Sequence, residues 1–172
     1  VTYDGGAIPY PPATNDLHHE IELVVALAKG GADIPEAQAL DHVFGYTVGL
    51  DMTRRDLQIA SRNKQRPWDL GKDVENSAVF APLTKVTDMA PIGTQSIHLS
   101  VNGEVKQDAT LAELIWKIEE IVSHLSGFYH LRPGDLIMTG TPAGVGPVVA
   151  GDVITGGIDG LDPISLTLAP GE

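Results

Sequence analysis

The sequence lacks cysteine entirely, which excludes disulfides, zinc–thiolate sites and iron–sulfur clusters. It is also poor in basic residues, with 11 Lys and Arg against 23 Asp and Glu and a net charge of −12. A chain this acidic offers no basic face for a phosphate backbone and is repelled by anionic membrane surfaces. The longest apolar run, residues 23–28, is far shorter than the roughly 18 residues of a membrane span. We therefore expect no nucleic-acid partner and no membrane partner.

Length and composition indicate one globular domain. The 172 residues are 42% hydrophobic and 20% charged, which is typical of a folded chain with a sizeable core. No linker, repeat or low-complexity tract divides the sequence, so we expect a single domain over residues 1–172. No signal peptide is recognisable, which favours a cytoplasmic location. The chain begins at Val1 without an initiator Met, so we expect either processing or a start inside a longer natural protein.

The expected fold class is mostly β with a few helices (α+β). The first sixteen residues are rich in Gly and Pro and are expected to form a loop with a short extended piece. Asn102-Gly103 between two β-forming runs indicates a hairpin with a type I′ turn. Strands are predicted from β-forming residues and alternation over 20–27, 44–51, 78–80, 97–105 (the hairpin), 136–138, 153–155 and 164–168.

Two short helices are expected in the first half of the chain. Pro35 in a first helical turn indicates a helix over 35–43. Thr53 is typical of an N-cap, with Asp56 three residues later, and predicts a helix over 54–63.

The clearest helical pattern covers residues 111–125. Apolar residues recur there every three or four positions. Thr110 and Glu113 are spaced as a capping box, and Gly127 provides a stop. We expect this helix to pack into the core and to say nothing about function.

Three carboxylates stand out against the strand pattern. Glu20 and Glu22 are two apart on a predicted strand, so their side chains point to one face while Ile21 points to the other. Asp51 closes an apolar strand just before a predicted helix. Gathered at one point, three carboxylates would form a hard-oxygen site suited to Mg²⁺, Mn²⁺ or Ca²⁺. The alternatives are a solvent-facing strand edge for the glutamates and a turn or cap role for Asp51.

Two further segments could share the charge of an anion. Lys72 follows a turn-forming stretch that contains Trp68, which could hold the ammonium partly desolvated; a solvated surface lysine is the alternative. Residues 139–146 are rich in Gly and resemble a backbone cradle for an anion, with ordinary turns as the alternative. No serine lies in a Gly-x-Ser-x-Gly elbow, so a serine hydrolase is a poor fit.

The order and spacing of these segments together resemble the fumarylacetoacetate hydrolase family, and the resemblance covers residues 7–169. It implies that family's mixed β-sheet roll. Two stretches, 17–20 and 66–69, are most similar to bacterial fumarylpyruvate hydrolases, in the acylpyruvate hydrolase subgroup. The matching segments are 19–22 (His-Glu-Ile-Glu), 45–58, Gly71-Lys72 and 139–146 (Thr-Gly-Thr-Pro-Ala-Gly-Val-Gly).

The resemblance implies roles for seven residues. The positions that hold a divalent metal in the family, usually Mg²⁺ or Mn²⁺, are matched by Glu20, Glu22 and Asp51. Lys72 matches a catalytic lysine that reaches the substrate or the metal shell. Positions that contact the substrate are matched by Arg55, Gln58 and Thr141. The family also implies a small dioxo-acid substrate and a homodimer.

Two departures from the family pattern are visible. Lys72-Asp73-Val74 stands where the family often has Lys-Ser-Phe, which adds a carboxylate beside the lysine. Relatives of the subgroup carry an upstream Gly-Arg-Asn-Tyr strand and a lid helix whose His–Glu pair activates water, and nothing in residues 1–17 matches them. We therefore expect a catalytic-type domain without that lid segment, or a subgroup that differs here. His18 and His19 precede the metal-matching positions on the same strand and are not expected to replace the lid pair.

The implied reaction is metal-dependent hydrolysis of a C–C bond in an acylpyruvate, with fumarylpyruvate cleaved to fumarate and pyruvate in aromatic (gentisate) catabolism. The metal would act as a Lewis acid on the developing enolate. Lys72 and backbone donors near Thr141 would share that charge. The same stabilisation would serve an oxaloacetate-type decarboxylase or a dienoate isomerase on this scaffold. A catalytically inactive metal-binding domain is the non-enzymatic alternative.

Overall fold

The computed structural model describes residues 1–171 and is built mainly of strands. In chain order the strands, α-helices and 3-10 turns (η) are β1 (Thr2–Tyr3), β2 (Ala7–Pro9), β3 (Leu17–His19), β4 (Ile21–Leu27), α1 (Glu36–Ala39), η1 (Leu40–His42), β5 (Val43–Asp51), β6 (Thr53–Arg54), α2 (Arg55–Asn63), α3 (Asp69–Lys72), β7 (Ala78–Phe80), β8 (Thr84–Lys85), η2 (Val86–Asp88), β9 (Ser96–Val101), β10 (Glu104–Thr110), η3 (Leu111–Glu113), α4 (Ile118–Ser126), β11 (Leu136–Met138), β12 (Gly146–Val148), β13 (Val153–Ile158) and β14 (Ile164–Ala169).

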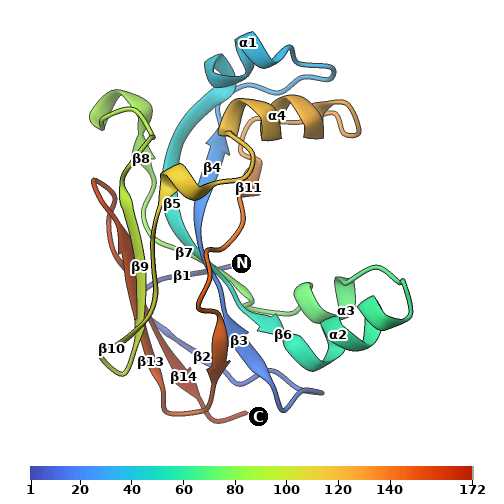
Figure 1. The fold of residues 1–172 in the computed structure, drawn as a ribbon, viewed down its shortest axis with the longest axis vertical. Coiled ribbons are helices and arrows are strands. Elements are labelled where there is room, and N and C mark those ends of the chain that lie inside the picture. The colour runs from blue at the N-terminus through green and yellow to red at the C-terminus, as the bar shows by residue number, and fades with distance from the viewer. Residues whose placement is uncertain (172) are drawn as a thin grey trace.

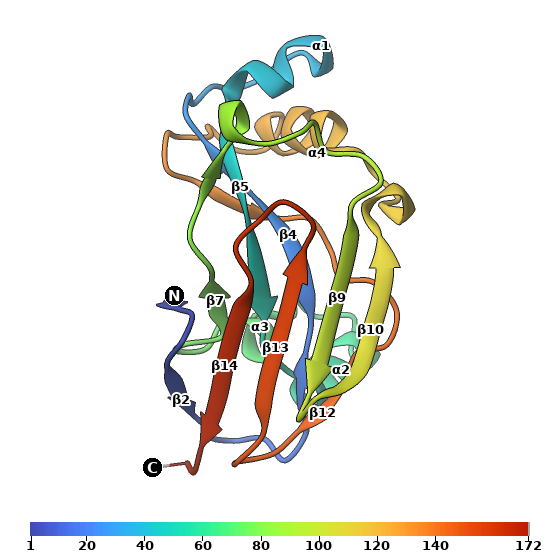
Figure 2. The same cartoon turned by 90° about the vertical axis from the view of Figure 1, so that its left-hand side faces the viewer.

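The strands form two large mixed sheets and one small sheet. The first large sheet has the order β1-β7-β5-β4-β11, with β8 also paired to β5, and its β1–β7 pair is parallel. The second has the order β10-β9-β13-β14-β2, with a parallel β14–β2 pair. The small sheet joins β12, β3 and β6. Figure 2 shows the second sheet in front of β4 and β5, so the two large sheets lie face to face.

The core lies between these two sheets and is set by alternation along β4. Ile21, Leu23, Val25 and Leu27 belong to the core cluster, and none of them is more than 2% exposed. Because successive strand side chains point to opposite faces, Glu22 lies on the other face of β4. The alternation therefore directs apolar side chains into the core and a carboxylate away from it.

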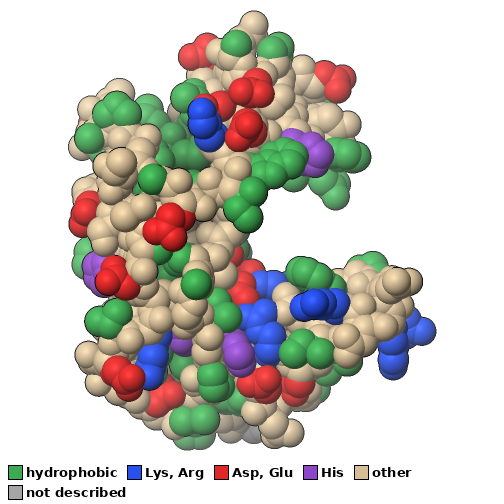
Figure 3. Space-filling model, in the orientation of Figure 1, with side chains coloured by type: hydrophobic (Ala, Val, Ile, Leu, Met, Phe, Trp, Pro, Cys, Tyr) green, Lys and Arg blue, Asp and Glu red, His purple; other side chains and the backbone are tan. Residues whose placement is uncertain are grey.

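Helices project from both ends of this sandwich toward the same side. Figure 1 shows α1 and α4 at one end and α2 and α3 at the other, which gives the molecule the outline of a letter C. The space-filling view confirms an open hollow between the two ends (Figure 3). Within residues 1–171, no helix combines the length and apolar character needed to cross a bilayer.

Close packing of α3 on α2 places Lys72. A Cβ built on Gly71 would lie 2.8 Å from Cβ and 2.9 Å from the backbone nitrogen of Gln58, so only glycine allows this approach. The buried guanidinium of Arg54 fixes the segment from the other side, because its Nε and Nη2 donate to the carbonyl of Leu70 at 3.0 and 2.7 Å.

Most of the expected strands are confirmed, and so is the mostly-β fold class. The hairpin is present, and Asn102 and Gly103 have φ values of 52° and 82°, as a type I′ turn requires. Six short strands were not predicted individually: β1, β2, β3, β6, β8 and β12. Each has only two or three residues, too few to show an alternating pattern.

The expectation of one helix over 111–125 is wrong. Residues 111–113 form a single 3-10 turn, and the α-helix begins only at Ile118. Leu114 between them is extended, with ψ of 124°. The capping box of Thr110 and Glu113 is present but caps only the short turn, and a second start forms where the Lys117 N–H donates to Glu120 Oε2 at 2.6 Å. Gly127 does end the helix.

The expected N-cap at Thr53 is also wrong. Thr53 lies in β6, its hydroxyl donates to the Asp51 carbonyl at 3.0 Å, and α2 begins at Arg55. The Asp56 carboxylate instead accepts a hydrogen bond from the Thr14 hydroxyl at 2.7 Å. Tertiary partners have replaced the local capping pattern.

Gly71→Ala should lower the free energy of unfolding by about 1–3 kcal/mol, since the added methyl group pushes α3 off α2. The matched control is Gly93→Ala, where a Cβ meets no atom within 4 Å, so its effect should stay within about 0.5 kcal/mol. Urea unfolding followed by circular dichroism measures both. Equal stability of the two variants would contradict the close approach.

Candidate functional site

The three carboxylates singled out in the sequence converge at one point. Glu22 lies on β4, Glu20 is the residue directly before the first residue of β4, and Asp51 ends the adjacent strand β5. The backbone N–H of Asp51 donates to the Glu20 carbonyl at 2.9 Å, which brings the two strand ends together. One oxygen from each of the three carboxylates lies within 4.8 Å of the others. Glu20 and Glu22 are buried, so the solvent-facing alternative does not hold for them.

Lys72 lies against this carboxylate cluster. Its Nζ donates to Glu20 Oε2 at 2.5 Å, to Asp51 Oδ2 at 2.6 Å and to the Thr53 hydroxyl at 2.8 Å. The surface-lysine alternative is therefore wrong. Asp73, the extra carboxylate beside the lysine, is exposed, whereas Lys72 pairs with Glu20 and Asp51.

A second cation approaches from α2. Arg55 Nη2 donates to Glu20 Oε1, and Nη1 of the same guanidinium donates to the side-chain oxygen of the buried Gln58. The β6–α2 junction sets this geometry, because Arg55 is the first residue of α2 and Gln58 lies one turn further along the same face.

Burial dominates the proton affinities of the cluster. It raises the pKa of Glu22 from 4.5 to about 7; the N–H of Gly140 opposes this shift, and the charges of Asp51 and Glu20 add to it. Burial also raises the pKa of Asp51, although Lys72 opposes it. For Lys72 burial disfavours the ammonium, but the hydrogen bonds with Asp51 and Glu20 outweigh it and raise the pKa.

The donor set fits a divalent cation. Three carboxylates against the two cationic side chains Lys72 and Arg55 leave one uncompensated negative charge. Burial raises the pKa of Glu22 to about 7, so the excess negative charge is least stable on this carboxyl when no cation is bound. All three candidate ligands are hard oxygens, which Mg²⁺ and Mn²⁺ prefer.

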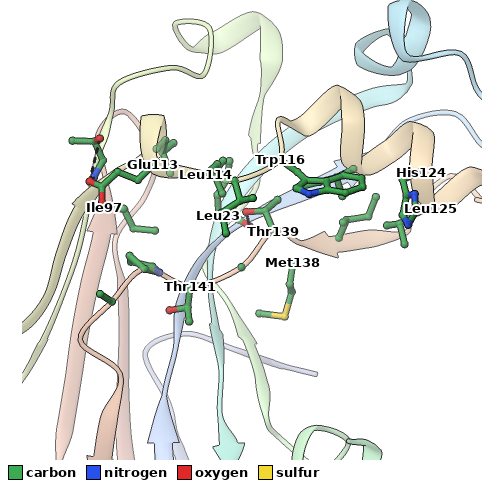
Figure 4. A pocket seen from close by; sticks show the side chains of 18 residues that line it. Leu23, Ile97, Glu113, Leu114, Trp116, His124, Leu125, Met138, Thr139 and Thr141 are labelled. Carbon is green, nitrogen blue, oxygen red and sulfur yellow. Dashed lines mark hydrogen bonds between the residues drawn. The ribbon is translucent and has the colours of Figure 1, made fainter. Parts of the chain in front are cut away.

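A cavity of about 580 Å³ opens beside the cluster. Its floor is the segment 139–143, and its opposite wall carries Leu114 and Trp116 from the chain between η3 and α4 (Figure 4). Figure 3 shows hydrophobic side chains on the upper wall of the hollow between the two ends of the molecule and charged side chains on its lower wall. The cluster side chains do not line this cavity, but Gly140 in its floor donates to Glu22, so a ligand bound at the cluster can extend toward the apolar wall.

The floor segment is bound to β4 on one side. Both the backbone N–H and the hydroxyl of Thr139 donate to the Leu23 carbonyl, at 3.2 and 2.9 Å. The N–H of Gly140 donates to Glu22 Oε2 at 2.7 Å. Gly140 has φ of 105°, a conformation that side-chain-bearing residues rarely adopt. The segment is thus a backbone donor to the cluster itself, and Thr141 follows directly in the cavity wall.

All seven residues implied by the resemblance lie in this one region: Glu20, Glu22, Asp51, Lys72, Arg55, Gln58 and Thr141. Their individual roles stay predictions. Three residues of this region were not predicted. Gln107 is 1% exposed and donates to the Thr141 hydroxyl at 2.8 Å, but no local pattern marks a glutamine in a strand as important. Trp116 and His124 line the cavity, although they belong to the stretch expected to be a featureless core helix.

Metal affinity should depend on pH through Glu22. Below its pKa of about 7 the carboxyl is protonated and must release a proton to bind a cation, so affinity falls as pH falls. Titration calorimetry with Mn²⁺ should show about tenfold weaker binding at pH 6 than at pH 8, with close to one proton released at pH 6. Glu22→Gln should bind more weakly but with little pH dependence. A flat profile in the unaltered protein would contradict the raised pKa.

Known proteins are similar to this chain over most of its length. The family model for fumarylacetoacetate (FAA) hydrolase, C-terminal, matches residues 1–169. The chain is 49% identical over 168 residues to fumarylpyruvate hydrolase of Ralstonia sp., covering 98% of this chain and 87% of the relative. It is 42% identical over 161 residues to the mitochondrial oxaloacetate tautomerase of Mus musculus, covering 92% and 72%.

A solved structure agrees with the sequence relatives. The crystal structure of fumarylpyruvate hydrolase from Pseudomonas aeruginosa in complex with Mn²⁺ and pyruvate superposes with a TM-score of 0.95 at 47% identity. The match covers 99% of this chain and 74% of that one. With the family model, the relatives and the fold in agreement, this chain belongs to the fumarylacetoacetate hydrolase family.

Proposed function

We propose that this chain is a divalent-metal-dependent acylpyruvate hydrolase that cleaves fumarylpyruvate to fumarate and pyruvate. The observation that carries the proposal is the buried cluster of Glu20, Glu22 and Asp51, which the N–H of Gly140 joins to the floor of a cavity with an apolar opposite wall. The relative from Ralstonia sp. has this activity in its name, and the Pseudomonas aeruginosa enzyme holds Mn²⁺ and pyruvate. The substrate partner is accordingly a small dioxo acid.

The cofactor is Mg²⁺ or Mn²⁺, held by Glu20, Glu22 and Asp51. When bound, it supplies a Lewis acid for the oxygens of the pyruvoyl group and for enolate charge. The protein's own cations add to this stabilisation. Lys72 and Arg55 both pair with Glu20, so positive charge stays beside the anionic end of the substrate without reorganisation.

The reaction breaks the bond between C3 and C4 of the dioxo acid. Water adds to the C4 carbonyl, the C3–C4 electron pair becomes the enolate of pyruvate, and a proton on C3 completes the product. The N–H of Gly140 is already engaged by Glu22, so of the adjoining floor groups the Thr141 hydroxyl is assigned to the pyruvoyl end. The fumaryl group then extends toward the wall of Leu114 and Trp116, where His124 also lines the cavity.

Tautomerisation of oxaloacetate is the second candidate. The relative from Mus musculus bears that name at 42% identity, and the same charges would stabilise an oxaloacetate enolate. Keto–enol exchange needs no C–C cleavage and no added water. Release of pyruvate from fumarylpyruvate, compared with loss of the oxaloacetate enol absorbance, separates the two activities.

We also propose that the chain forms a homodimer, as its family resemblance implies. Large apolar side chains near the cavity are exposed, including Ile115 at 94% and Phe128 at 71%, and a second copy would cover apolar surface of this kind. Light scattering after size exclusion should give twice the 18.2 kDa chain mass. A mass of one chain at micromolar concentration would contradict the dimer. The cytoplasmic location and the place in aromatic catabolism stay predictions.

The first test of the proposed function is titration of Mn²⁺ into the protein, alone and with oxalate, a stable mimic of the pyruvate enolate. We expect metal binding that oxalate tightens, followed by metal-dependent release of pyruvate from fumarylpyruvate. Absence of metal binding would overturn both the proposed metal site and the metal-dependent activity that rests on it. Metal and oxalate binding without pyruvate release would instead favour the tautomerase.

Lys72→Met should separate metal binding from catalysis. Turnover should fall about 100-fold to 1,000-fold, because a preorganised charge at the substrate is lost. Affinity for Mn²⁺ should stay equal or increase, since the ammonium that competes for Glu20 and Asp51 is removed. The matched control, Lys64→Met at the exposed end of α2, should leave both unchanged. Turnover of the Lys72 variant within twofold of the original would show that the lysine has no catalytic role.

A further inference from the structure

Gln107 is a buried amide that joins three parts of the fold. It lies on β10 where the pairing with β9 shifts register between Val105 and Gln107, and its residue is 1% exposed. From there its side chain reaches both the start of β4 and the cavity floor. The mechanism above gives it no role.

Backbone partners fix which end of this amide is the oxygen. The N–H of Ile21 can only donate, and it lies 3.2 Å from Oε1. The carbonyl of Pro142 can only accept, and it lies 2.9 Å from Nε2. The reversed orientation would set donor against donor and acceptor against acceptor at a buried position, which is costly.

This orientation decides the polarity of the Thr141 hydroxyl, that is, whether it accepts a hydrogen bond from Gln107 or donates one to it. Nε2 of Gln107 lies 2.8 Å from Thr141 Oγ1, so the hydroxyl oxygen accepts that hydrogen bond. Among residues 1–171 this is the one hydrogen bond that the hydroxyl makes, so its own proton is left to point elsewhere. Thr141 lines the cavity opposite Trp116, and the cavity is where a further acceptor can lie (Figure 4).

The same orientation fixes His19. Its Nδ1 lies 2.9 Å from Gln107 Oε1, which can only accept, so Nδ1 carries the proton. The chain of donors therefore runs in one direction, from His19 and Ile21 into Gln107 and from Gln107 into Thr141. A reversal at any one link would leave a buried group without a partner.

We propose that Gln107 is a positioning residue that makes the Thr141 hydroxyl a hydrogen-bond donor to an oxygen anion in the cavity. The ligand class is the carboxylate or enolate oxygen of a 2-oxo acid. The assignment rests on the proposed function for the identity of that ligand, while the polarity itself rests on the amide geometry alone.

Gln107→Glu tests the polarity with almost no change of shape. A carboxylate still accepts from Ile21 and His19 but cannot donate, so the Thr141 hydroxyl turns to donate to residue 107 and presents lone pairs to the cavity. At pH 8.5 the affinity of the Mn²⁺-loaded protein for oxalate should fall about tenfold or more. The oxalate affinity of Thr141→Val should fall by a similar factor, and the double variant should lose little affinity beyond either single variant.

The matched control is Gln95→Glu. Gln95 also bridges a backbone N–H and a backbone carbonyl, accepting from Gly93 at 2.6 Å and donating to Pro91 at 2.8 Å, but it contacts no cavity hydroxyl. Its oxalate affinity should match that of the unaltered protein. Affinity for Mn²⁺ alone should stay within about twofold in Thr141→Val, Gln107→Met and Gln95→Glu, and it should not fall in Gln107→Glu, whose added carboxylate lies beside His19 and Ile21; a general loss of structure would lower it in all of them.

The outcomes separate the two proposals. If the unaltered Mn²⁺-loaded protein does not bind oxalate, the proposed function fails, and this inference fails with it. If it binds oxalate but Thr141→Val binds equally well, the hydroxyl is no donor and only this inference is overturned. If Thr141→Val loses affinity while the uncharged, near-isosteric Gln107→Met keeps it, the hydroxyl acts without Gln107 and the positioning role is overturned, because a loss in Gln107→Glu alone can come from its added negative charge.

Discussion

The structure depends on holding three carboxylates together in a largely buried place. The candidate ligand atoms lie within 4.8 Å of one another. At that distance two like charges repel by roughly 3.5 kcal/mol even at an effective dielectric constant of about 20, a large fraction of the stability of an ordinary domain. The fold opposes this repulsion with two cations from the α2–α3 arm, since Lys72 and Arg55 both pair with Glu20. Burial raises the pKa of Glu22 to about 7, so below neutral pH a proton on this carboxyl offsets the remaining charge. The architecture around the cluster can be understood as the support for these few contacts.

That support comes from opposite ends of the molecule. The segment with α2 and α3 carries the cations Lys72 and Arg55. Its position depends on the absence of a side chain at Gly71 and on the hydrogen bond from Arg54 to the Leu70 carbonyl. The other end delivers the apolar wall, through the extended residues between η3 and α4. Between them, β4 carries the core on one face and Glu22 on the other. One strand thus couples the stability of the sandwich to the geometry of the cavity.

Where local pattern and tertiary contact agree, the sequence was a reliable guide. The alternation in residues 20–27 predicted both the buried strand and the common face of the two glutamates, because side-chain direction in a strand is a local property. The Asn102-Gly103 turn is equally local, since two positive φ values select those residues. The helical period over 111–125 misled for a physical reason. Leu114 and Ile121 are apolar because they face a cavity or the core, and that requirement is the same whether the backbone between them is helical or extended.

The sequence by itself determined the fold class, the family resemblance and the residue types of the metal site, because these follow from patterns of a few neighbouring residues. Only the tertiary structure decided which groups meet. Thr53 is not the expected N-cap, and its hydroxyl contacts Lys72, 19 positions away. Gln107 contacts His19 and Thr141, which are 88 and 34 positions away. Such contacts depend on how the sheets stack and where a bulge turns a side chain, and no local spacing encodes either. The carboxylates could be predicted from the chain, whereas the direction of the hydrogen bonds around them could not.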